Sequence, residues 1–438
     1  MVKVLTGRIM VVRLIMLTAM AALIGIGICA IYAAGNPDPA EATGRPLVPA
    51  GAWQKQLIFA IAGLAALVMI NMINYRLLGP ASYWLYPAIL LLLAAVLLGK
   101  FFTIPFMPKI NGACRWLQPI PGYDIKIQPS EFCKLAYILA LAWYLRFRSN
   151  YRHFKGLLGP FSLTLLAMVL ILLEPDLGTV VLLMPILFAM LYVAGAKVKH
   201  LILIMLLGLV VSPVLWLNMR PYQRMRVSAV LLQNDWILQK AMKHPKFADI
   251  LAADRDRGIS GAENLKTWNA NRGFHLEHSK YATASGGLWG YGFRKGPYIT
   301  QNGRGSPYSL PEKHNDFIFA IIAHQWGFAG CLVVIGLYGV IVMCAIEIAW
   351  RNTDPFARLI TVGIIAMFAV AVIVNVSMTL GLMPITGLTL PFVSYGGSSL
   401  MVSMMAIGLL NNIGRCRPFT VAGKGLENLE FIPPSVGA

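Results

Sequence analysis

Ten long apolar runs divide this sequence and restrict what it can fold into. A helix that crosses a bilayer needs about 20 mostly apolar residues, and its backbone must satisfy its own hydrogen bonds. Charged residues are 13% of the chain, about half the share found in soluble domains. The runs therefore predict an all-α polytopic membrane protein of about ten transmembrane helices, at residues 10–34, 54–74, 82–99, 131–146, 158–174, 177–195, 200–217, 316–346, 358–381 and 396–413.

Basic residues in the short connections predict the orientation of these spans. Lysine and arginine concentrate in short cytoplasmic loops, and among the short connections here, those on one side carry most of these residues. The long segment 218–315 is basic too, but loops of that length cross the membrane largely regardless of charge. Both termini are therefore expected in the cytoplasm, with the first run as an uncleaved span. Beyond the basic N-terminus, the residues of this set are Arg76, Arg146, Arg148, Arg152, Lys155, Lys197, Lys199, Arg351, Arg358, Arg415 and Arg417.

The longest polar segment, residues 218–315, separates the seventh and eighth spans. With this orientation it forms a large extracytoplasmic loop of a single membrane domain, residues 1–438. Residues 233–272 have the composition of an insertion, with a short amphipathic helix at Trp236–Leu251 that is either solvated or lies at the membrane interface. Prolines and glycines interrupt apolar sequence at 381–399, so we expect either a re-entrant segment before the last span or the wall of a cavity.

Ionisable residues at the edges of spans are costly, so each is a candidate functional residue. Ser130 is a suitable N-cap for the fourth span. Glu131 and Lys134 stand three residues apart, so they share a helix face and can pair. The spacing fits an internal ion pair and a substrate-facing pair equally well. Pro175 ends the fifth span, and Asp176 is expected to cap the sixth.

Two further groups belong to the long polar segment. Arg220, Arg224 and Arg226 follow the seventh span. Three guanidinium groups at a membrane surface suit either phosphate binding or contact with lipid headgroups. Residues 285–292 are too rich in glycine for a helix and too apolar for a free loop. They are expected either to wrap closely around a ligand or to turn at the interface.

Residues 310–327 form a polar motif where the long polar segment meets the eighth span. Asn315 and Asp316 are both good N-caps, and capping alone explains their position. Partial desolvation by Phe317 and Phe319 would raise the pKa of the Asp316 carboxyl group and suit it to act as a base. Residue chemistry alone leaves both roles open.

Taken together, six stretches resemble the SEDS family of bacterial cell-wall proteins, which includes FtsW and RodA. The resemblance covers about residues 110–413, and the last two stretches are the most specific. The family's fold has ten spans, which agrees with the count above. The six stretches are Gly112–Trp116, Gln128–Leu135, Glu174–Thr179, Tyr222–Arg224, Leu310–Ala320 and Leu390–Ser399.

The resemblance implies a peptidoglycan glycosyltransferase of the bacterial cytoplasmic membrane. Such proteins polymerise lipid II, a disaccharide-pentapeptide on undecaprenyl pyrophosphate, at the outer face of the membrane. They work among membrane lipids with a class B penicillin-binding protein, and no nucleic-acid partner is expected. The family's essential acid corresponds to Asp316. Its glutamate and lysine at the start of the fourth span correspond to Glu131 and Lys134, and its loop arginine to Arg115.

The implied chemistry fits these residue types. Asp316 is assigned as the general base that takes the proton from a sugar 4-hydroxyl as it attacks a second lipid-linked sugar. The pyrophosphate leaving group needs positive charge, from side chains or from a divalent cation such as Mg²⁺ or Mn²⁺, for which no protein ligands are assigned. No second carboxylate is evident as nucleophile, so inversion is expected. The expected substrate-binding residues are Arg115, Glu131, Lys134, Arg224, Arg226, Lys313, Ser394 and Tyr395.

Two other functions would use the same residues. A lipid II flippase would use the cavity and its cations for passage, and a non-catalytic scaffold would position the penicillin-binding protein. The chain departs from the family pattern at His324 and Gln325, where an acidic pair is usual. The sequence does not separate a role in cell elongation from one in division.

Overall fold

Helices occupy all ten predicted spans in the computed structural model of the chain. The structure describes residues 2–41, 48–49, 51–99, 107–110, 113–118, 126–147, 153–219, 221–253, 258–266, 273–301 and 306–416. Between the third and fourth helices, β1 (Lys109–Ile110) pairs with β2 (Ala113–Cys114) in a short antiparallel ladder. The ten helices are α1 (Val2–Gly35), α2 (Ala52–Met72), α3 (Tyr75–Leu98), α4 (Pro129–Leu145), α5 (Leu158–Leu173), α6 (Leu177–Ala194), α7 (Val198–Asn218), α14 (Ile318–Arg351), α15 (Pro355–Thr379) and α16 (Gly397–Arg415).

Seven helices in the described part of the chain are long and apolar enough to cross a membrane, namely α1, α2, α3, α5, α6, α14 and α15. Two of the other three are shorter or more polar: α4 has 17 residues, and α16 ends in the polar residues Asn411, Asn412 and Arg415. In α7 the apolar stretch over which the structure describes the side chains is Val198–Pro213. The structure therefore confirms an all-α polytopic membrane protein, and the total of ten spans stays a prediction.

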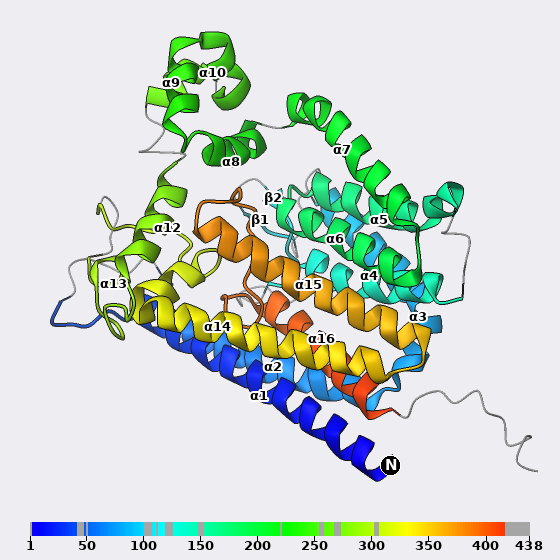
Figure 1. Cartoon of the computed structure of the whole chain (residues 1–438). Coiled ribbons are helices and arrows are strands. Elements are labelled where there is room, and N and C mark those ends of the chain that lie inside the picture. Colours follow the sequence, from blue (N-terminus) through cyan, green and yellow to red (C-terminus); the bar gives the residue numbers. More distant parts are fainter. Residues whose placement is uncertain are drawn as a thin grey trace, which may run out of the picture.

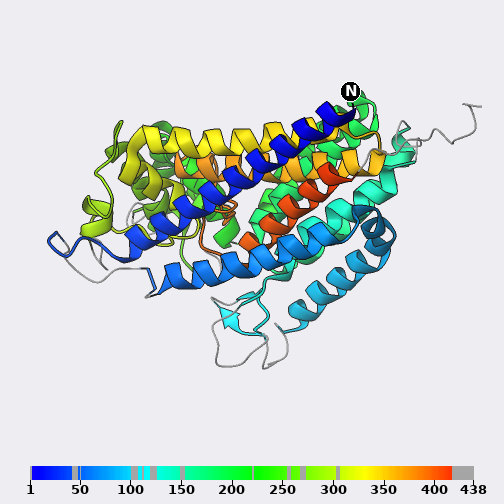
Figure 2. The same ribbon diagram turned by 90° about the horizontal axis from the view of Figure 1, so that it is seen from below.

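The long helices pack side by side in one bundle (Figure 1, Figure 2). α1 packs along α14 and α2 along α16, whereas α15 contacts both α14 and α6, and α4 contacts α3 and α15. The N-terminus and the end of α16 lie at the same end of the bundle, and the first residues of α14 lie at the opposite end (Figure 1). This arrangement agrees with two termini on one side of a membrane.

The basic residues assigned to the cytoplasm gather at the end of the bundle that holds the N-terminus. Arg8 Nε lies 3.5 Å from Glu347 Oε1 near the end of α14. Arg13 Nε donates to Asn411 Oδ1 on α16 at 2.7 Å, and Arg415 follows one helical turn later. This clustering supports the predicted orientation. Three members of the set lie outside the described residues: Arg148, Arg152 and Arg417.

The predicted extracytoplasmic loop contains short helices, of which α8 to α12 share an apolar cluster separate from the main core. The prediction of one helix over Trp236–Leu251 is wrong, because α9 ends at Lys243 and α10 starts at Pro245. Proline lacks the N–H group that would continue the helix, and it disfavours helical backbone at His244. The helices are α8 (Pro221–Leu231), α9 (Asp235–Lys243), α10 (Pro245–Ala252), α11 (Gly261–Lys266), α12 (Phe274–Ser285) and α13 (Pro297–Thr300), and a 3₁₀ turn, η2 (Phe154–Leu157), precedes α5.

α14 is kinked at Gly327, which has φ 63° and ψ −159°. A kink leaves backbone groups of the helix without their usual partners, and the glycine-rich residues 285–292 supply new ones. This segment therefore wraps around a helix backbone, a third outcome beside the two predicted for it. Four backbone hydrogen bonds join the two segments, from donor to acceptor: Phe328 to Gly287 (2.8 Å), Ala329 to Leu288 (3.1 Å), Tyr291 to His324 (3.0 Å) and Gly292 to Gln325 (3.0 Å).

Replacing Gly290 with alanine should destabilise the protein more than Gly292→Ala. Both glycines have positive φ, 76° and 94°, where an alanine costs about 1–2 kcal/mol. A methyl group at Gly290 would also overlap the carbonyl oxygen of Gln325, whereas no atom lies within 4 Å of the corresponding position at Gly292. Thermal unfolding of the detergent-solubilised variants measures the difference. An equal fall in Tm for both would contradict the close approach of the two segments.

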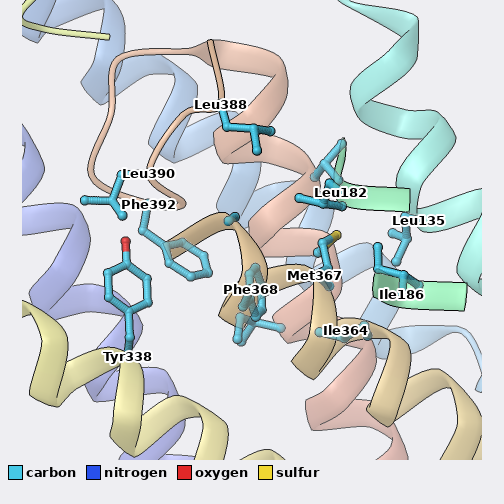
Figure 3. Close-up of a cluster of buried hydrophobic side chains, with 14 of the residues drawn as sticks. Leu135, Leu182, Ile186, Tyr338, Ile364, Met367, Phe368, Leu388, Leu390 and Phe392 are labelled. Atoms are coloured by element: carbon cyan, nitrogen blue, oxygen red, sulfur yellow. The ribbon is translucent and has the colours of Figure 1, made fainter. Parts of the chain in front are cut away.

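Residues 380–396 connect α15 to α16 without helical structure. Leu388, Leu390 and Phe392 are buried in the main apolar core, where they meet side chains of α6 and α15 (Figure 3). The ring centroids of Phe392 and Phe368 are 5.3 Å apart. Residues 388–394 are thus mostly buried in protein, as non-helical backbone at membrane depth would require, whereas Leu382 is 70% exposed. The depth of the segment in a membrane stays a prediction.

Candidate active site

Asp316 lies in the turn before α14 and not at the N-cap of that helix. α14 begins at Ile318, Phe317 occupies the N-cap, and no side chain caps the helix. The N–H group of Asp316 donates to the carbonyl of Glu312 at 3.1 Å, and this turn sets the carboxylate ahead of the first helical residue. The prediction of Asn315 or Asp316 as the cap is therefore wrong. Asn315 instead donates from Nδ2 to the Glu312 carboxylate at 2.7 Å.

Two neighbouring elements hold the backbone of the Asp316 turn. From α15, Asn375 donates from Nδ2 to the carbonyls of Asp316 and Leu388, at 3.0 and 2.7 Å. From the connection before α16, the Ser394 hydroxyl donates to the carbonyl of Asn315 at 2.7 Å. Asn375 was not among the sequence-based candidates, although a lone amide in an apolar span is the kind of polar residue that marks a site. These bonds fix the position of the backbone that carries the Asp316 carboxylate.

Arg226 on α8 approaches the same place as the Asp316 carboxylate. A methyl group at Gly387 would lie 3.8 Å from Asp316 Oδ2 and 3.9 Å from Arg226 Nη1. Gly387 has φ 78°, a backbone conformation that favours glycine. The chain thus passes beside both charged groups without adding a side chain between them. Arg220, which was predicted to act with Arg226, lies outside the described residues.

The electrostatic surroundings of Asp316 make it more basic than an exposed aspartate. Burial raises the pKa of this carboxyl group to about 6, and the nearby Glu312 and Asp176 carboxylates also raise it. The Arg226 and Arg115 guanidinium groups act in the opposite direction. Desolvation therefore outweighs the attraction of the two arginines. At neutral pH most of the group is ionised, yet it retains the affinity for a proton that a general base needs.

Arg115 is bound to the turn between α5 and α6. Its Nε donates to the carbonyl of Glu174 at 2.7 Å, and its Nη2 donates to the carbonyl of Pro175. Glu174 itself is 1% exposed, and neither of its carboxylate oxygens has a hydrogen-bond partner. A buried carboxyl group without partners is rare and costly. The sequence-based candidates omit Glu174, although a carboxylate at the end of an apolar span is itself a functional signal.

Asp176 accepts hydrogen bonds from polar groups at the starts of α4 and α6. It caps α6, as predicted, by accepting from the N–H group of Thr179 at 3.3 Å. The prediction of Ser130 as the cap of α4 is wrong, because Gln128 occupies the N-cap and Pro129 begins the helix. Proline is favoured at that first position, where a missing N–H group costs nothing. The Ser130 hydroxyl instead donates to Asp176 Oδ2 at 2.9 Å.

Glu131 and Lys134 form an ion pair inside the helix bundle. Lys134 Nζ lies 2.7 Å from Glu131 Oε2, and both side chains are buried. They border a small cavity whose walls include Ser399 and Ser403 of α16, with room for about one water molecule. The structure forms the internal ion pair, which was one of the two predicted arrangements. Contact of this pair with substrate stays a prediction.

Two of the predicted phosphate-binding cations are enclosed by protein. Arg224 is 4% exposed, and its Nε has no hydrogen-bond partner. Lys313 is fully buried, and its Nζ donates to the carbonyl of Tyr298 at 3.2 Å. Burial lowers the pKa of Lys313 to about 7. Arg115 and Arg226 are partly exposed and are therefore better placed than these two residues to contact phosphate directly.

Ser394 and Tyr395 join the connection before α16 to the Asp316 turn. Besides the bond from its hydroxyl, Ser394 accepts at its carbonyl from Gln56 Nε2 of α2 at 3.1 Å. The N–H group of Tyr395 donates to the carbonyl of His314 at 2.9 Å, and the two rings lie 5.5 Å apart. The structure thus gives both residues a part in shaping the turn. Their contact with substrate stays a prediction.

His324 and Gln325, at the positions where the resemblance implies an acidic pair, are both buried. Gln325 accepts from the N–H group of Arg294 at 2.6 Å and donates to the carbonyl of Lys295 at 2.7 Å. An amide can donate and accept together, which an ionised carboxylate cannot do. Arg294 extends the connection, because its Nε donates to the carbonyl of Asn36 beyond α1 at 2.6 Å. Gln325 thus helps to hold α14 against the end of α1.

A divalent cation has no evident set of protein ligands in the described part of the chain. No three His, Cys, Asp or Glu side chains in those ranges lie close enough together to hold a metal ion. A cation shared with pyrophosphate oxygens stays a prediction, and we derive no reaction step through it.

These features define an integral membrane protein with a charged site at one end of a helix bundle, built from a carboxylate and partly exposed arginines. The model of the FtsW, RodA and SpoVE family, described as a cell cycle protein, matches residues 13–238 and 250–417. The chain belongs to this family.

Named relatives cover most of the chain. A probable peptidoglycan glycosyltransferase FtsW of Trichlorobacter lovleyi is 31% identical over 91% of this chain and 92% of its own length. The peptidoglycan glycosyltransferase RodA of Treponema pallidum is 31% identical over 91% and 96%. Two solved structures cover 91% of this chain. One, reported as structural coordination of polymerization and crosslinking by a peptidoglycan synthase complex, has TM-score 0.66, 28% identity and 96% of its chain covered. Thermus thermophilus RodA has TM-score 0.57, 26% identity and 95% covered.

Proposed function

We propose that this chain is a peptidoglycan glycosyltransferase that polymerises lipid II, with Asp316 as the general base. The observation that carries the proposal is a partly buried carboxyl group, with a pKa of about 6, that lies on the same side of Gly387 as the Arg226 guanidinium group. Family membership supports the class of reaction, since the relatives above are named for it. No observation in the structure favours a flippase or a scaffold over this activity.

In the proposed reaction, the 4-hydroxyl group of one lipid-linked sugar attacks the anomeric carbon of another. Asp316 accepts the hydroxyl proton as the new carbon–oxygen bond forms. The bond from the anomeric carbon to the pyrophosphate oxygen breaks, and undecaprenyl pyrophosphate leaves with the electron pair. Arg226 and Arg115 offset the negative charge that develops on this leaving group. A single displacement inverts the anomeric centre, by analogy with inverting glycosidases.

We assign the Asp316 site to the extracytoplasmic face of the bacterial cytoplasmic membrane. The basic residues of the N-terminus and of the short connections assigned to the cytoplasm gather at the end of the bundle that holds the N-terminus, and such residues favour the cytoplasm. The Asp316 turn precedes α14 at the other end (Figure 1). A class B penicillin-binding protein is the proposed partner, since a similar chain occurs in a solved peptidoglycan synthase complex.

Purified protein in liposomes with labelled lipid II tests this activity. Glycan chains resolved on a gel are the expected product, both from the chain alone and in larger amount with a class B penicillin-binding protein. Lipid II that crosses the bilayer without polymer would favour the flippase. If neither product nor transport appears with the partner present, the scaffold becomes the better assignment.

Polymerisation should rise with pH through a midpoint near 6, because Asp316 accepts a proton only when ionised and its pKa is about 6. Glu312→Gln removes a negative charge that raises this pKa, so the midpoint should move to lower pH. Initial rates between pH 5 and 8 measure the shift. Glu277→Gln, the same change elsewhere in the loop, should leave the midpoint in place. A midpoint that ignores Glu312→Gln would argue against Asp316 as the titrating group.

A further inference from the structure

One face of α9 and α10 combines exposed apolar and basic side chains. Trp236 and Ile250 are 67% and 46% exposed. Lys240 joins the two helices, because its Nζ lies 4.8 Å from the ring centroid of Trp236 and 5.9 Å from that of Phe247. The Trp236 face, as we name it, consists of Trp236, Lys240, Lys243, Lys246, Phe247 and Ile250.

The short helices α8 to α12, which we call the module, pack so that this face points outward. Ala241 of α9 and Ala248 of α10 are fully buried in the apolar cluster that α8 to α12 share. Residues four apart lie on one side of a helix, so Trp236 and Lys240 share a side of α9 that differs from that of Ala241. Asp249 Oδ1 accepts from the N–H group of Gly261 at 2.6 Å, and Asp235 is the other acidic residue of the two helices. Against Lys240, Lys243 and Lys246, these two carboxylates leave one net positive charge on the lysine and aspartate side chains of α9 and α10.

The face coincides with a break in the family pattern. The family match stops at residue 238 and resumes at residue 250. The unmatched interval contains all three lysines of the face and Phe247. The Trp236 face is therefore a property of this chain that the shared pattern of the family does not account for. Asp316, Arg115 and Arg226 all lie in the matched parts.

The module stands next to the end of a lipid-facing helix. α7 ends at Asn218, and α8 begins at Pro221. Along α7, apolar side chains such as Leu209 and Val210 are 69% and 72% exposed, so this helix would face lipid in a membrane. Figure 1 shows α9 and α10 displaced sideways from the long helices, beside that end of α7. In a membrane, the module would therefore lie beside the lipid surface.

We propose that the Trp236 face docks on anionic lipid headgroups of the outer leaflet. Tryptophan favours the headgroup level of a bilayer, and lysines close to an anionic surface are attracted to it. Short amphipathic helices bind membranes through this combination. Because α8 shares the module's apolar cluster and carries Arg226, docking also holds this arginine at a set height above the bilayer.

Hydrogen–deuterium exchange of the full chain in nanodiscs tests the proposal. In discs with about one third phosphatidylglycerol, the amides of residues 235–252 should exchange about tenfold more slowly than in pure phosphatidylcholine. The amides of α12 should exchange equally in both. K240E/K243E should remove the lipid dependence. K280E/K295E changes two other exposed lysines of the same loop, and this matched control should keep it.

Three outcomes would overturn the proposal. Equal exchange of residues 235–252 in both lipids would exclude anionic headgroups as the ligand. Loss of the lipid dependence in K280E/K295E would show a general charge effect of the loop. Slower exchange only after addition of a class B penicillin-binding protein would assign the face to a protein partner. Trp236→Ser, at an exposed position, should weaken the lipid effect while α12 exchange stays unchanged. None of these results depends on lipid II polymerisation.

Discussion

Asp316→Asn should reduce the rate of lipid II polymerisation by about 10²- to 10⁴-fold, the range that a positioned general base contributes. Asparagine keeps the size of the side chain but cannot accept the proton of a sugar hydroxyl. Initial rates should be compared at pH 8, where the wild-type carboxyl group, with a pKa of about 6, is ionised. Glu312→Gln makes the same charge change four residues earlier and should retain most of the activity at that pH. Near-normal polymerisation by Asp316→Asn would remove this residue from the mechanism.

A stability measurement distinguishes loss of the catalytic base from misfolding of the Asp316 turn. The pKa of Asp316 is raised above its unfolded value, first by burial and then by Glu312, so the folded state disfavours the charged form. For this group stability therefore falls as pH rises from about 4 towards 6, and the penalty is present at neutral pH. A neutral asparagine removes that penalty. Thermal unfolding at pH 7 should show an equal or higher Tm for Asp316→Asn, and a clearly lower Tm would point to a misfolded turn.

Lys134→Met should lower stability by about 3–5 kcal/mol, because it leaves the Glu131 carboxylate buried without its partner. The double variant Glu131→Gln/Lys134→Met removes both charges and should recover most of the loss. The unfolding Tm of each purified variant measures these changes in stability, and the variants together form a mutant cycle. The pair Arg351–Glu347, with Nε and Oε1 2.6 Å apart but more exposed, provides the matched control. Arg351→Met should cost about 0–1 kcal/mol, as surface pairs do.

The same cycle decides between the two predicted roles of the pair. If Glu131 and Lys134 serve only as an internal ion pair, the double variant should regain polymerisation together with stability. If they also contact substrate, stability should return while polymerisation stays low. Equal stability of Lys134→Met and wild type would mean that the pair is hydrated in the membrane and not buried as the structure has it.

The spans and the catalytic motif could be predicted because their determinants are local. Long apolar runs specify membrane helices whatever the rest of the chain does, and Asp316 stands in a short, recognisable stretch. Asp176 was likewise correctly predicted as a cap from its immediate neighbours. Local reasoning failed where a competing backbone choice existed nearby. Ser130 and Asp316 are both residue types that cap helices well. The helices begin at Pro129 and Ile318, so Gln128 and Phe317 occupy the N-cap positions instead.

Contacts between distant segments could not be predicted from local patterns. Asn375 reaches the Asp316 turn across 59 residues of sequence, and nothing in its apolar surroundings specifies that partner. The glycines of 285–292 were expected either to wrap around a ligand or to turn at the interface, and neither prediction named another backbone segment as the partner. Their partner is the interrupted helix at Gly327, which only the folded arrangement brings alongside. The sequence does place Glu174 at the end of an apolar span, but the lack of any hydrogen-bond partner for its carboxylate is a property of the packed state.

The kink at Gly327 also has a mechanical consequence. It divides α14 into two rods with different attachments. The short rod, Ile318–Trp326, follows the Asp316 turn directly and is fastened through residues 285–292 and Arg294 to the end of α1. The long rod continues to Arg351 within the bundle. A tilt of the long rod reaches the short rod across Gly327, and Phe328 and Ala329 of the long rod are themselves bonded to Gly287 and Leu288. Tyr338 of the long rod also donates to the carbonyl of Pro391, in the connection that holds the Asp316 turn. The Asp316 turn is thus coupled both to the membrane-spanning part of α14 and to the loop outside it.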